Sequence, residues 1–311
     1  MSVNNPVDID DIFKKNTKSM SYRNARPTPD AASKESRDRL RRCSFILDSP
    51  ATYKSFTTFA SDVEAIAALG YGAIELQLRT PEDVNITELA SLLASCGLRF
   101  CAFQTGFAYL EKHIYLASVD QNKRQAAADL LKRYVDLAAR FQAIVVLGLL
   151  QGTRGDEPNP QVRIAHLSEE LSILAEYAAA AGVVIVIEPV NRYECDIFHN
   201  TAADVLRTVN RIASAGLRAM IDTFHANIEE RSETEAARLL APVLAHVHLS
   251  ETNRGLFGSG HLDFSAFFRV LEEIQYPGFV SIGIYRQNGS AADHARSARD
   301  HLNGVFETLA E

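Results

Sequence analysis

The feature of this sequence that most constrains its fold is a regular alternation of short apolar runs with amphipathic helical stretches. Eight runs have the length and the β-branched and aromatic content of strands. They are residues 43–47, 72–78, 98–103, 143–150, 183–189, 217–222, 244–250 and 278–284. Most are almost continuously apolar, which indicates a parallel sheet buried on both faces. Eight strand–helix units predict an α/β fold, a closed (β/α)₈ TIM barrel.

An open, doubly wound sheet is the main alternative to a barrel. It is disfavoured because no GxGxxG turn follows the first run, as a dinucleotide-binding sheet requires. The 311 residues fit one barrel with additions, and a hydrophobic content of 47% is enough for a large core. We therefore expect one catalytic barrel domain at residues 43–311, preceded by an irregular N-terminal extension at residues 1–42.

The extension differs from the rest of the chain in charge. It holds ten Lys or Arg and six Asp or Glu, a net charge of +4, so residues 43–311 carry -11 of the overall -7. The extension is expected to lie across the acidic body or a neighbouring subunit, and a partly ordered tail without a role is the alternative. An acidic surface repels phosphate backbones, so nucleic acid is not expected as a partner.

The sequence offers no sign of export or of membrane contact. Its four cysteines have no CxxC spacing, which favours reduced thiols. The first residues contain no apolar run typical of a signal peptide, and no stretch approaches the length of a membrane span. We therefore expect a cytoplasmic protein with no membrane partner.

Polar side chains stand where three of the later strands are expected to end. The fifth run ends near Glu188 and the sixth at Asp222, while the seventh carries His246 and His248 on one side of its strand. A carboxylate at the mouth of an apolar barrel is costly unless it is paired or bound to a metal. Two carboxylates and one imidazole therefore predict a site for a divalent ion such as Mn²⁺, Mg²⁺ or Co²⁺. The alternative is that each residue caps a helix or pairs with an arginine, and only one of the two histidines is needed for a metal.

Three segments of the later half carry a family resemblance. They are IEPVNRYECD at 187–196, IDTFHANIEE at 221–230 and HVHLSETNRGLFGSGHLDF at 246–264. In this order and spacing they resemble motifs of the ketose 3-epimerases, the D-tagatose and D-psicose 3-epimerases and related keto-sugar-acid epimerases among the xylose isomerase-like barrels. The resemblance implies a small-molecule sugar or keto-sugar substrate and a homo-oligomer, either a dimer or a tetramer.

The resemblance also implies roles for single residues. Glu188 matches a metal ligand that is also the catalytic base, and Asp222 and His248 match two further metal ligands. The residues that match substrate-binding positions are Glu194, His225 and Arg254. Taken alone, Arg254 is better explained as an ordinary surface arginine, and Glu194 as a carboxylate that leads into a helix.

The chain departs from the family at the end of the eighth strand. There the family has a glutamate that is the fourth metal ligand and the second catalytic base, whereas YPGFVSIGIYRQ places Gly283 at that position. Three outcomes remain open. In the first, another group replaces the base, for example Tyr285, which lies on the same side of the strand. In the second, the reaction needs only one base, and in the third the site binds sugar and turns it over slowly.

Together these patterns predict a divalent-metal-dependent keto-sugar epimerase or isomerase. The expected reaction is proton abstraction by Glu188 next to a carbonyl, through an enediolate, with Mn²⁺ as the expected ion, held by three protein ligands. The alternatives are a keto-sugar lyase or dehydratase and a catalytically weak carbohydrate-binding barrel or complex subunit.

Overall fold

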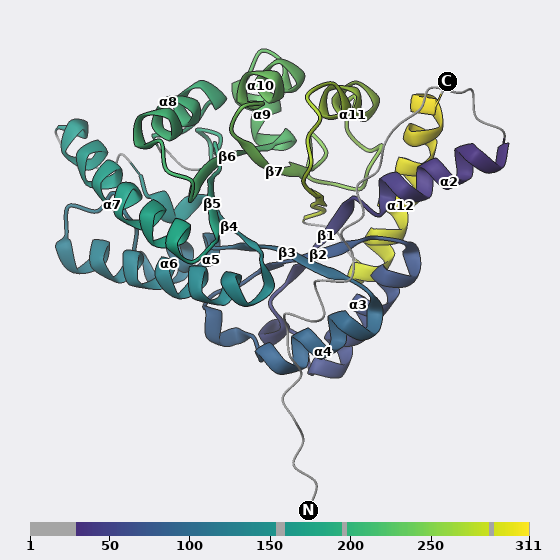
Figure 1. Ribbon diagram of the computed structural model, residues 1–311, viewed down its shortest axis with the longest axis horizontal. Coiled ribbons are helices and arrows are strands. Elements are labelled where there is room, and N and C mark those ends of the chain that lie inside the picture. Colours follow the sequence, from purple (N-terminus) through teal and green to yellow (C-terminus); the bar gives the residue numbers. More distant parts are fainter. Residues whose placement is uncertain (1–28, 154–158, 195–197, 286–288, 311) are drawn as a thin grey trace, which may run out of the picture.

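The structure is a computed structural model that describes residues 29–153, 159–194, 198–285 and 289–310. Eight parallel strands form a closed barrel in chain order, and pairing of the last strand with the first closes it (Figure 1). The strands are β1 (Cys43–Asp48), β2 (Ala73–Gln77), β3 (Arg99–Gln104), β4 (Ile144–Leu147), β5 (Val184–Ile187), β6 (Leu217–Asp222), β7 (Leu244–Leu249) and β8 (Val280–Ile282). Each predicted run overlaps one strand, which confirms the (β/α)₈ barrel.

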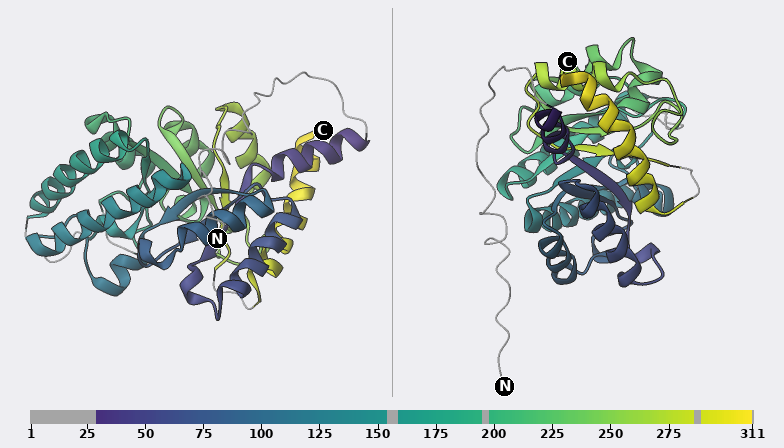
Figure 2. Two further views of the ribbon diagram at one scale, coloured as in Figure 1. Left: turned by 60° about the horizontal axis from the view of Figure 1, so that its bottom comes forward. Right: turned by 90° about the vertical axis from the view of Figure 1, so that its right-hand side faces the viewer.

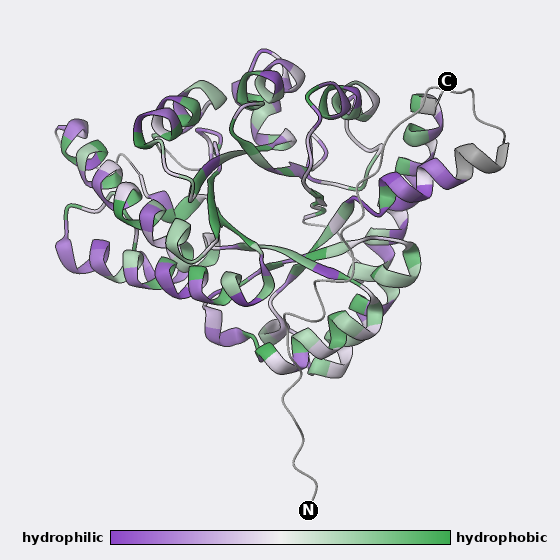
Figure 3. Cartoon of the chain, viewed as in Figure 1, coloured by the Kyte–Doolittle hydropathy of each residue, from purple (hydrophilic) through white to green (hydrophobic). Residues whose placement is uncertain are grey.

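Helices surround the barrel and follow its strands. The longer ones are α3 (Phe56–Leu69), α4 (Ile86–Cys96), α6 (Gln121–Phe141), α7 (Pro160–Ala180), α8 (Ala202–Ile212), α10 (Glu233–Leu240), α11 (Phe264–Glu273) and α12 (Ala291–Ala310). Short helices α5 (Gly106–Lys112) and α9 (Thr223–Glu229) and the 3₁₀ turns η2 (Pro50–Thr52), η3 (Pro81–Asp83) and η4 (Leu149–Gln151) lie in the loops that follow strands. In Figure 3 the strands are mainly hydrophobic and the helices are mixed, as a barrel buried beneath amphipathic helices requires.

Local sequence explains where the helices begin. Side-chain oxygens of Ser55, Asn85 and Asp120 accept hydrogen bonds from the first backbone amides of α3, α4 and α6. Helix α8 begins with a capping box between Thr201 and Asp204. These caps fix the starting points of the helices, and with them the lengths of the loops at the mouth of the barrel.

The expected irregular extension at residues 1–42 is wrong for its last part, because Pro29–Leu40 forms helix α2. This helix packs against α12 (Figures 1 and 2), with Leu40 buried. Arg39 Nε lies 3.1 Å from Glu272 Oε1, and the Arg42 guanidinium donates to the carbonyl of Tyr276. Two of the basic residues of the extension, Arg39 and Arg42, therefore bind specific groups on the barrel. The rest of the extension lies outside the described residues.

Two further expectations concern redox state and membranes. Cys43, Cys96 and Cys101 are free thiols, and Cys195 lies outside the described residues. Within the described ranges, no helix has the length and apolar character needed to cross a lipid bilayer.

Candidate metal and active site

The structure brings together the three residues that the sequence predicts as metal ligands. Glu188 directly follows β5, Asp222 ends β6, and His248 on β7 is in register with Asp222. His248 Nδ1 lies 3.7 Å from Glu188 Oε1 and 3.7 Å from Asp222 Oδ2. One ligand atom of each residue lies within 4.8 Å of the others. Two carboxylates and an imidazole converging at this distance fit a divalent metal ion.

The electrostatics of this cluster keep Asp222 ionised. Burial alone would raise the pKa of Asp222, but the hydrogen bond with His248 and the nearby cationic groups outweigh it and lower the pKa to about 2. Asp222 Oδ1 also accepts a 2.8 Å hydrogen bond from the amide of Phe224 at the start of α9. Burial would lower the pKa of His248, yet Glu75, Asp222 and Glu188 together raise it well above its usual value.

Glu75 on β2 was not singled out from the sequence. Its side chain is completely buried, and its two oxygens lie 2.8 Å from His246 Nε2 and 2.8 Å from His248 Nε2. Gln104 Nε2 donates a third hydrogen bond of 2.8 Å to Glu75. A signal was present, because Glu75 is a charged residue inside a strand that is otherwise almost wholly apolar. His246 is thus accounted for as a core histidine with a partner.

Gly148 after β4 is a second residue that sequence reasoning missed. A Cβ atom at this position would lie 2.3 Å from Glu188 Oε2, so only glycine leaves room for the carboxylate. The neighbouring Gln151 donates hydrogen bonds to the carbonyls of Leu147 and Glu188. The loop after β4 therefore holds Glu188 from two sides.

His225 on α9 is buried beside Glu188. Its Nδ1 accepts a 3.2 Å hydrogen bond from the backbone amide of Asn191, which places the ring proton on Nε2. This Nε2 lies 3.8 Å from Glu188 Oε1 and 3.2 Å from Arg254 Nη2. Because both groups are donors, neither satisfies the other. A carbonyl or hydroxyl oxygen next to Glu188 would accept from both.

Arg254 is not an ordinary surface arginine. Its guanidinium lies over the rings of Phe224 and Tyr285, at 4.1 and 5.1 Å from their centroids, and 2.9 Å from Glu194 Oε1. Its Nε is buried without a hydrogen-bond partner in the described structure. Its backbone adopts the left-handed conformation, with φ of 57°, which costs energy in a residue with a side chain. Such strain is typical of functional sites.

The space next to Gly283 is filled by other side chains. A Cβ atom there would lie 2.7 Å from Tyr285 Cε2, 3.0 Å from Tyr285 Oη and 2.9 Å from Ser250 Oγ. Ser250 Oγ is buried and has no partner among the described residues. The ring of Tyr285 therefore occupies the region into which a glutamate at 283 would extend.

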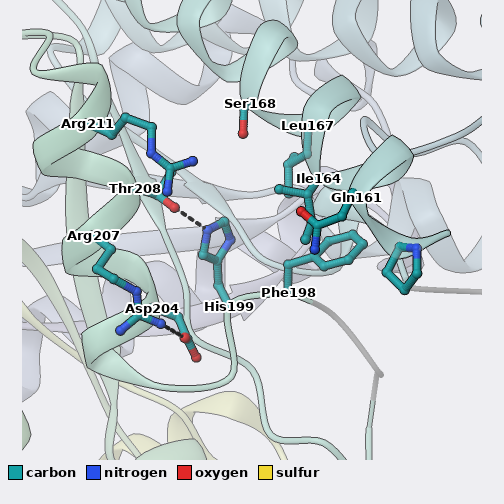
Figure 4. A pocket seen from close by; sticks show the side chains of 11 residues that line it. Gln161, Ile164, Leu167, Ser168, Phe198, His199, Asp204, Arg207, Thr208 and Arg211 are labelled. Atoms are coloured by element: carbon teal, nitrogen blue, oxygen red, sulfur yellow. Dashed lines mark hydrogen bonds and ion pairs between the residues drawn. The ribbon is translucent and has the colours of Figure 1, made fainter.

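A separate cavity of about 370 Å³ lies between α7 and α8 (Figure 4). None of the predicted site residues lines it. Its wall includes His199, whose Nε2 lies 2.7 Å from Thr208 Oγ1 and whose Nδ1 pairs with Gln151 Oε1. Burial lowers the pKa of His199 to about 4. This neutral histidine helps to hold the Gln151 side chain that supports Glu188.

Comparisons with known proteins agree with this architecture. The family model described as the xylose isomerase-like TIM barrel matches residues 63–304. The chain belongs to this family. An L-ribulose 3-epimerase of Mesorhizobium japonicum is 32% identical over 214 residues, 68% of this chain and 70% of that protein. A 3-dehydro-D-guloside 4-epimerase of Escherichia coli is 36% identical over 136 residues, 44% of this chain and 50% of its own length.

Solved structures of the family superpose well on the barrel. A crystal structure of an L-ribulose 3-epimerase aligns with a TM-score of 0.73 and 26% identity, covering 85% of this chain and 95% of its own. The resemblance to the ketose 3-epimerases and the xylose isomerase-like fold are therefore confirmed. The expectation of an isomerase is confirmed by relatives named as L-ribulose, ketose and D-psicose 3-epimerases. The roles of the individual site residues stay predictions.

Proposed function

We propose that this protein is a divalent-metal-dependent keto-sugar epimerase that abstracts a proton next to a carbonyl and forms an enediolate. The observation that carries the proposal is the convergence of Glu188, Asp222 and His248 beside two nitrogen donors that face each other without satisfying each other. The names of the relatives support a ketose or a keto-glycoside as the substrate class.

Glu188, Asp222 and His248 would hold the ion, with Mn²⁺ as the expected metal and Mg²⁺ or Co²⁺ as alternatives. A bound divalent ion polarises a carbonyl oxygen and makes the neighbouring C–H more acidic. Glu188 takes this proton. The Nε2–H of His225 and the guanidinium of Arg254 donate to the substrate oxygen on which negative charge develops. Glu194 keeps Arg254 in place through their ion pair.

Epimerisation also requires a proton donor on the opposite face of the carbon. Tyr285 has the position for this role, because its hydroxyl lies 3.0 Å from the point where a side chain at 283 would begin. Burial raises the pKa of Tyr285, so the phenol is neutral and ready to donate. After donation, the tyrosinate is stabilised by Arg254 until solvent returns the proton that Glu188 removed.

The decisive experiment follows deuterium from D₂O into the substrate. Purified protein with Mn²⁺ is incubated with a panel of ketoses, keto-sugar acids and 3-keto-glycosides, and the products are read by NMR. Inverted product that carries deuterium at the reacting carbon is expected. Exchange without inversion would instead establish a one-base isomerase or lyase. Absence of exchange with every sugar in the panel would establish a catalytically weak barrel.

Two variants assign the bases. Glu188→Gln should abolish exchange, with a loss of about 10²- to 10⁴-fold, since general bases contribute that much. Tyr285→Phe keeps the ring but loses the hydroxyl, so it should still exchange the proton on the Glu188 face and fail to invert the centre. Wild-type inversion by Tyr285→Phe would show that the second acid is another group.

The assembly is a further part of the proposal. The family resemblance favours a dimer or tetramer, with a small-molecule sugar as the only other partner. Light scattering on the purified protein distinguishes these states from a monomer.

A further inference from the structure

Two clusters of carboxylates and histidines in this barrel share one histidine. His248 faces Glu188 and Asp222 through Nδ1, and it faces Glu75 through Nε2. The second cluster, formed by Glu75, His246 and His248, is at most 2% exposed. It lies behind the predicted metal site and is not needed to complete that site's ligand set.

A carboxylate so deep in a barrel requires strong compensation, because burying an unpaired charge is very costly. Glu75 receives it from three donors, since His246, His248 and Gln104 each place a nitrogen 2.8 Å from a Glu75 oxygen. An ionised carboxylate only accepts hydrogen bonds. Both histidines must therefore carry a proton on Nε2.

This arrangement fixes which atom of His248 is available to a metal. With Nε2–H bonded to Glu75, only Nδ1 can give up its proton to bind a metal, and Nδ1 is the atom that faces Glu188 and Asp222. The carboxylate itself cannot turn, because His246 holds one oxygen and Gln104 the other. His246 also lies 3.3 Å from Ser281 Oγ on β8. The orientation of His248 is thus held by residues of strands β2, β3, β7 and β8.

We propose that Glu75 is a positioning residue that sets the tautomer and ring orientation of His248 for metal binding. This inference rests on the proposed function, because it assumes that His248 binds a metal ion. Carboxylates hydrogen-bonded to a ligating histidine commonly raise metal affinity by 10- to 100-fold. Glu75 would act in the same way, without contact with the substrate.

The same three residues invite a different interpretation, a second metal ion bound between Glu75, His246 and His248. The distances favour hydrogen bonding, since 2.8 Å is an ordinary separation of donor and acceptor and the oxygens already have their partners. The stoichiometry of metal binding distinguishes the two, with one ion per chain expected.

The test compares Mn²⁺ affinity by calorimetry for wild type and Glu75→Gln. Glutamine has nearly the same shape, but its oxygen can accept from only one of the two histidines. We expect Mn²⁺ affinity to fall about 10- to 100-fold. The Mn²⁺ affinity of Glu75→Asp, which keeps the charge on a shorter side chain, should lie between those of wild type and Glu75→Gln. This variant provides the test if Glu75→Gln does not fold.

Thr105→Val is the matched control for loss of a buried hydrogen bond. Thr105 is completely buried and donates a 2.9 Å hydrogen bond to the carbonyl of Val146. Within the described residues it forms no hydrogen bond with Glu75. Its Mn²⁺ affinity should stay within about threefold of wild type even if its stability falls, since no group near the ligands changes. If the Mn²⁺ affinity of Thr105→Val fell as much as that of Glu75→Gln, the loss would come from general destabilisation of the core. That result would overturn the proposal.

A spectroscopic readout reports the histidine directly. In ¹⁵N-histidine-labelled protein loaded with diamagnetic Mg²⁺, the Nε2–H proton of His248 should resonate downfield because it bonds to a carboxylate, and Glu75→Gln should abolish this shift. Wild-type affinity in folded Glu75→Gln, or two ions per wild-type chain, would overturn the positioning role while leaving the proposed function intact. If wild type binds no divalent metal ion, the proposed function itself fails and this inference fails with it.

Discussion

Substitution of Gly283 by alanine tests whether the Tyr285 ring and the glycine depend on each other. The new Cβ would lie 2.7 Å from Tyr285 Cε2 and 2.9 Å from Ser250 Oγ. Carbon atoms in contact are normally about 3.5–4.0 Å apart, so the ring must move by roughly 1 Å. Forcing an extra methyl group into a packed site costs about 1–3 kcal/mol of unfolding free energy.

The ring cannot move without disturbing the site. Arg254 lies over it at 5.1 Å, and the amide of Tyr285 donates to the carbonyl of Arg254. We therefore expect Gly283→Ala to lower both the free energy of unfolding and the catalytic rate. Gly283→Glu should be at least as destabilising, and by itself it should fail to tighten metal binding, because Tyr285 occupies the path of its side chain.

A double-mutant cycle measured by urea denaturation isolates the effect. In a Tyr285→Ala background the ring is gone, so Gly283→Ala should cost only a few tenths of a kcal/mol, which corresponds to a coupling of about 1–2 kcal/mol between the two positions. In the same background, Gly283→Glu has room to reach the cluster and should tighten Mn²⁺ binding. Equal costs of Gly283→Ala in both backgrounds would refute the reasoning, because the ring would then not be what glycine accommodates.

Three further predictions follow from other parts of the structure. Gly148→Ala places a Cβ 2.3 Å from Glu188 Oε2 and displaces the carboxylate, so Mn²⁺ affinity and turnover should fall about tenfold or more while circular dichroism stays unchanged. The pKa of His199 is near 4 in the fold and about 6.5 in the unfolded chain, so its contribution is fully present above pH 6.5 and is lost as the pH falls toward 4. Denaturation at pH 7 and pH 5 should show this loss, about 1.4 kcal/mol per pH unit in that range, and His199→Gln should reduce it. A protein without residues 1–40 should melt at a lower temperature than one without residues 1–28, because α2 packs on α12; equal melting temperatures of the two truncated proteins would show that α2 does not stabilise the barrel.

The part of the site at the ends of β5, β6 and β7 was predictable from sequence. In a parallel barrel the strands point the same way, so polar residues that close successive apolar runs must converge. Glu188 and Asp222 needed only this rule, whereas the choice of His248 over His246 came from the family resemblance. The barrel itself was predictable for the same reason, since eight apolar runs alternating with helical segments have few other arrangements.

The remaining features depend on contacts that the local pattern does not contain. Glu75 meets His246 and His248 across the barrel, which requires the relative heights of β2 and β7. Helix α2 is stabilised by packing on α12 at the far end of the chain, so its own composition gave little sign of order. The alternation rule put Tyr285 on the side of Gly283, but β8 ends at Ile282, so only the structure places the ring against the glycine.

Gly283 and Tyr285 therefore constitute one change rather than two. A Cβ atom at 283 would lie 2.7 Å from Tyr285 Cε2, so with the ring in this position a glutamate at 283 would have to displace it. The exchange replaces an anion with a neutral hydroxyl. In the proposed function, Glu188 and Asp222 alone would balance the charge of a divalent ion, with Glu75 acting on it only through His248. Glu188 would then be the single carboxylate base, and Tyr285 would return a proton to the opposite face of the substrate carbon.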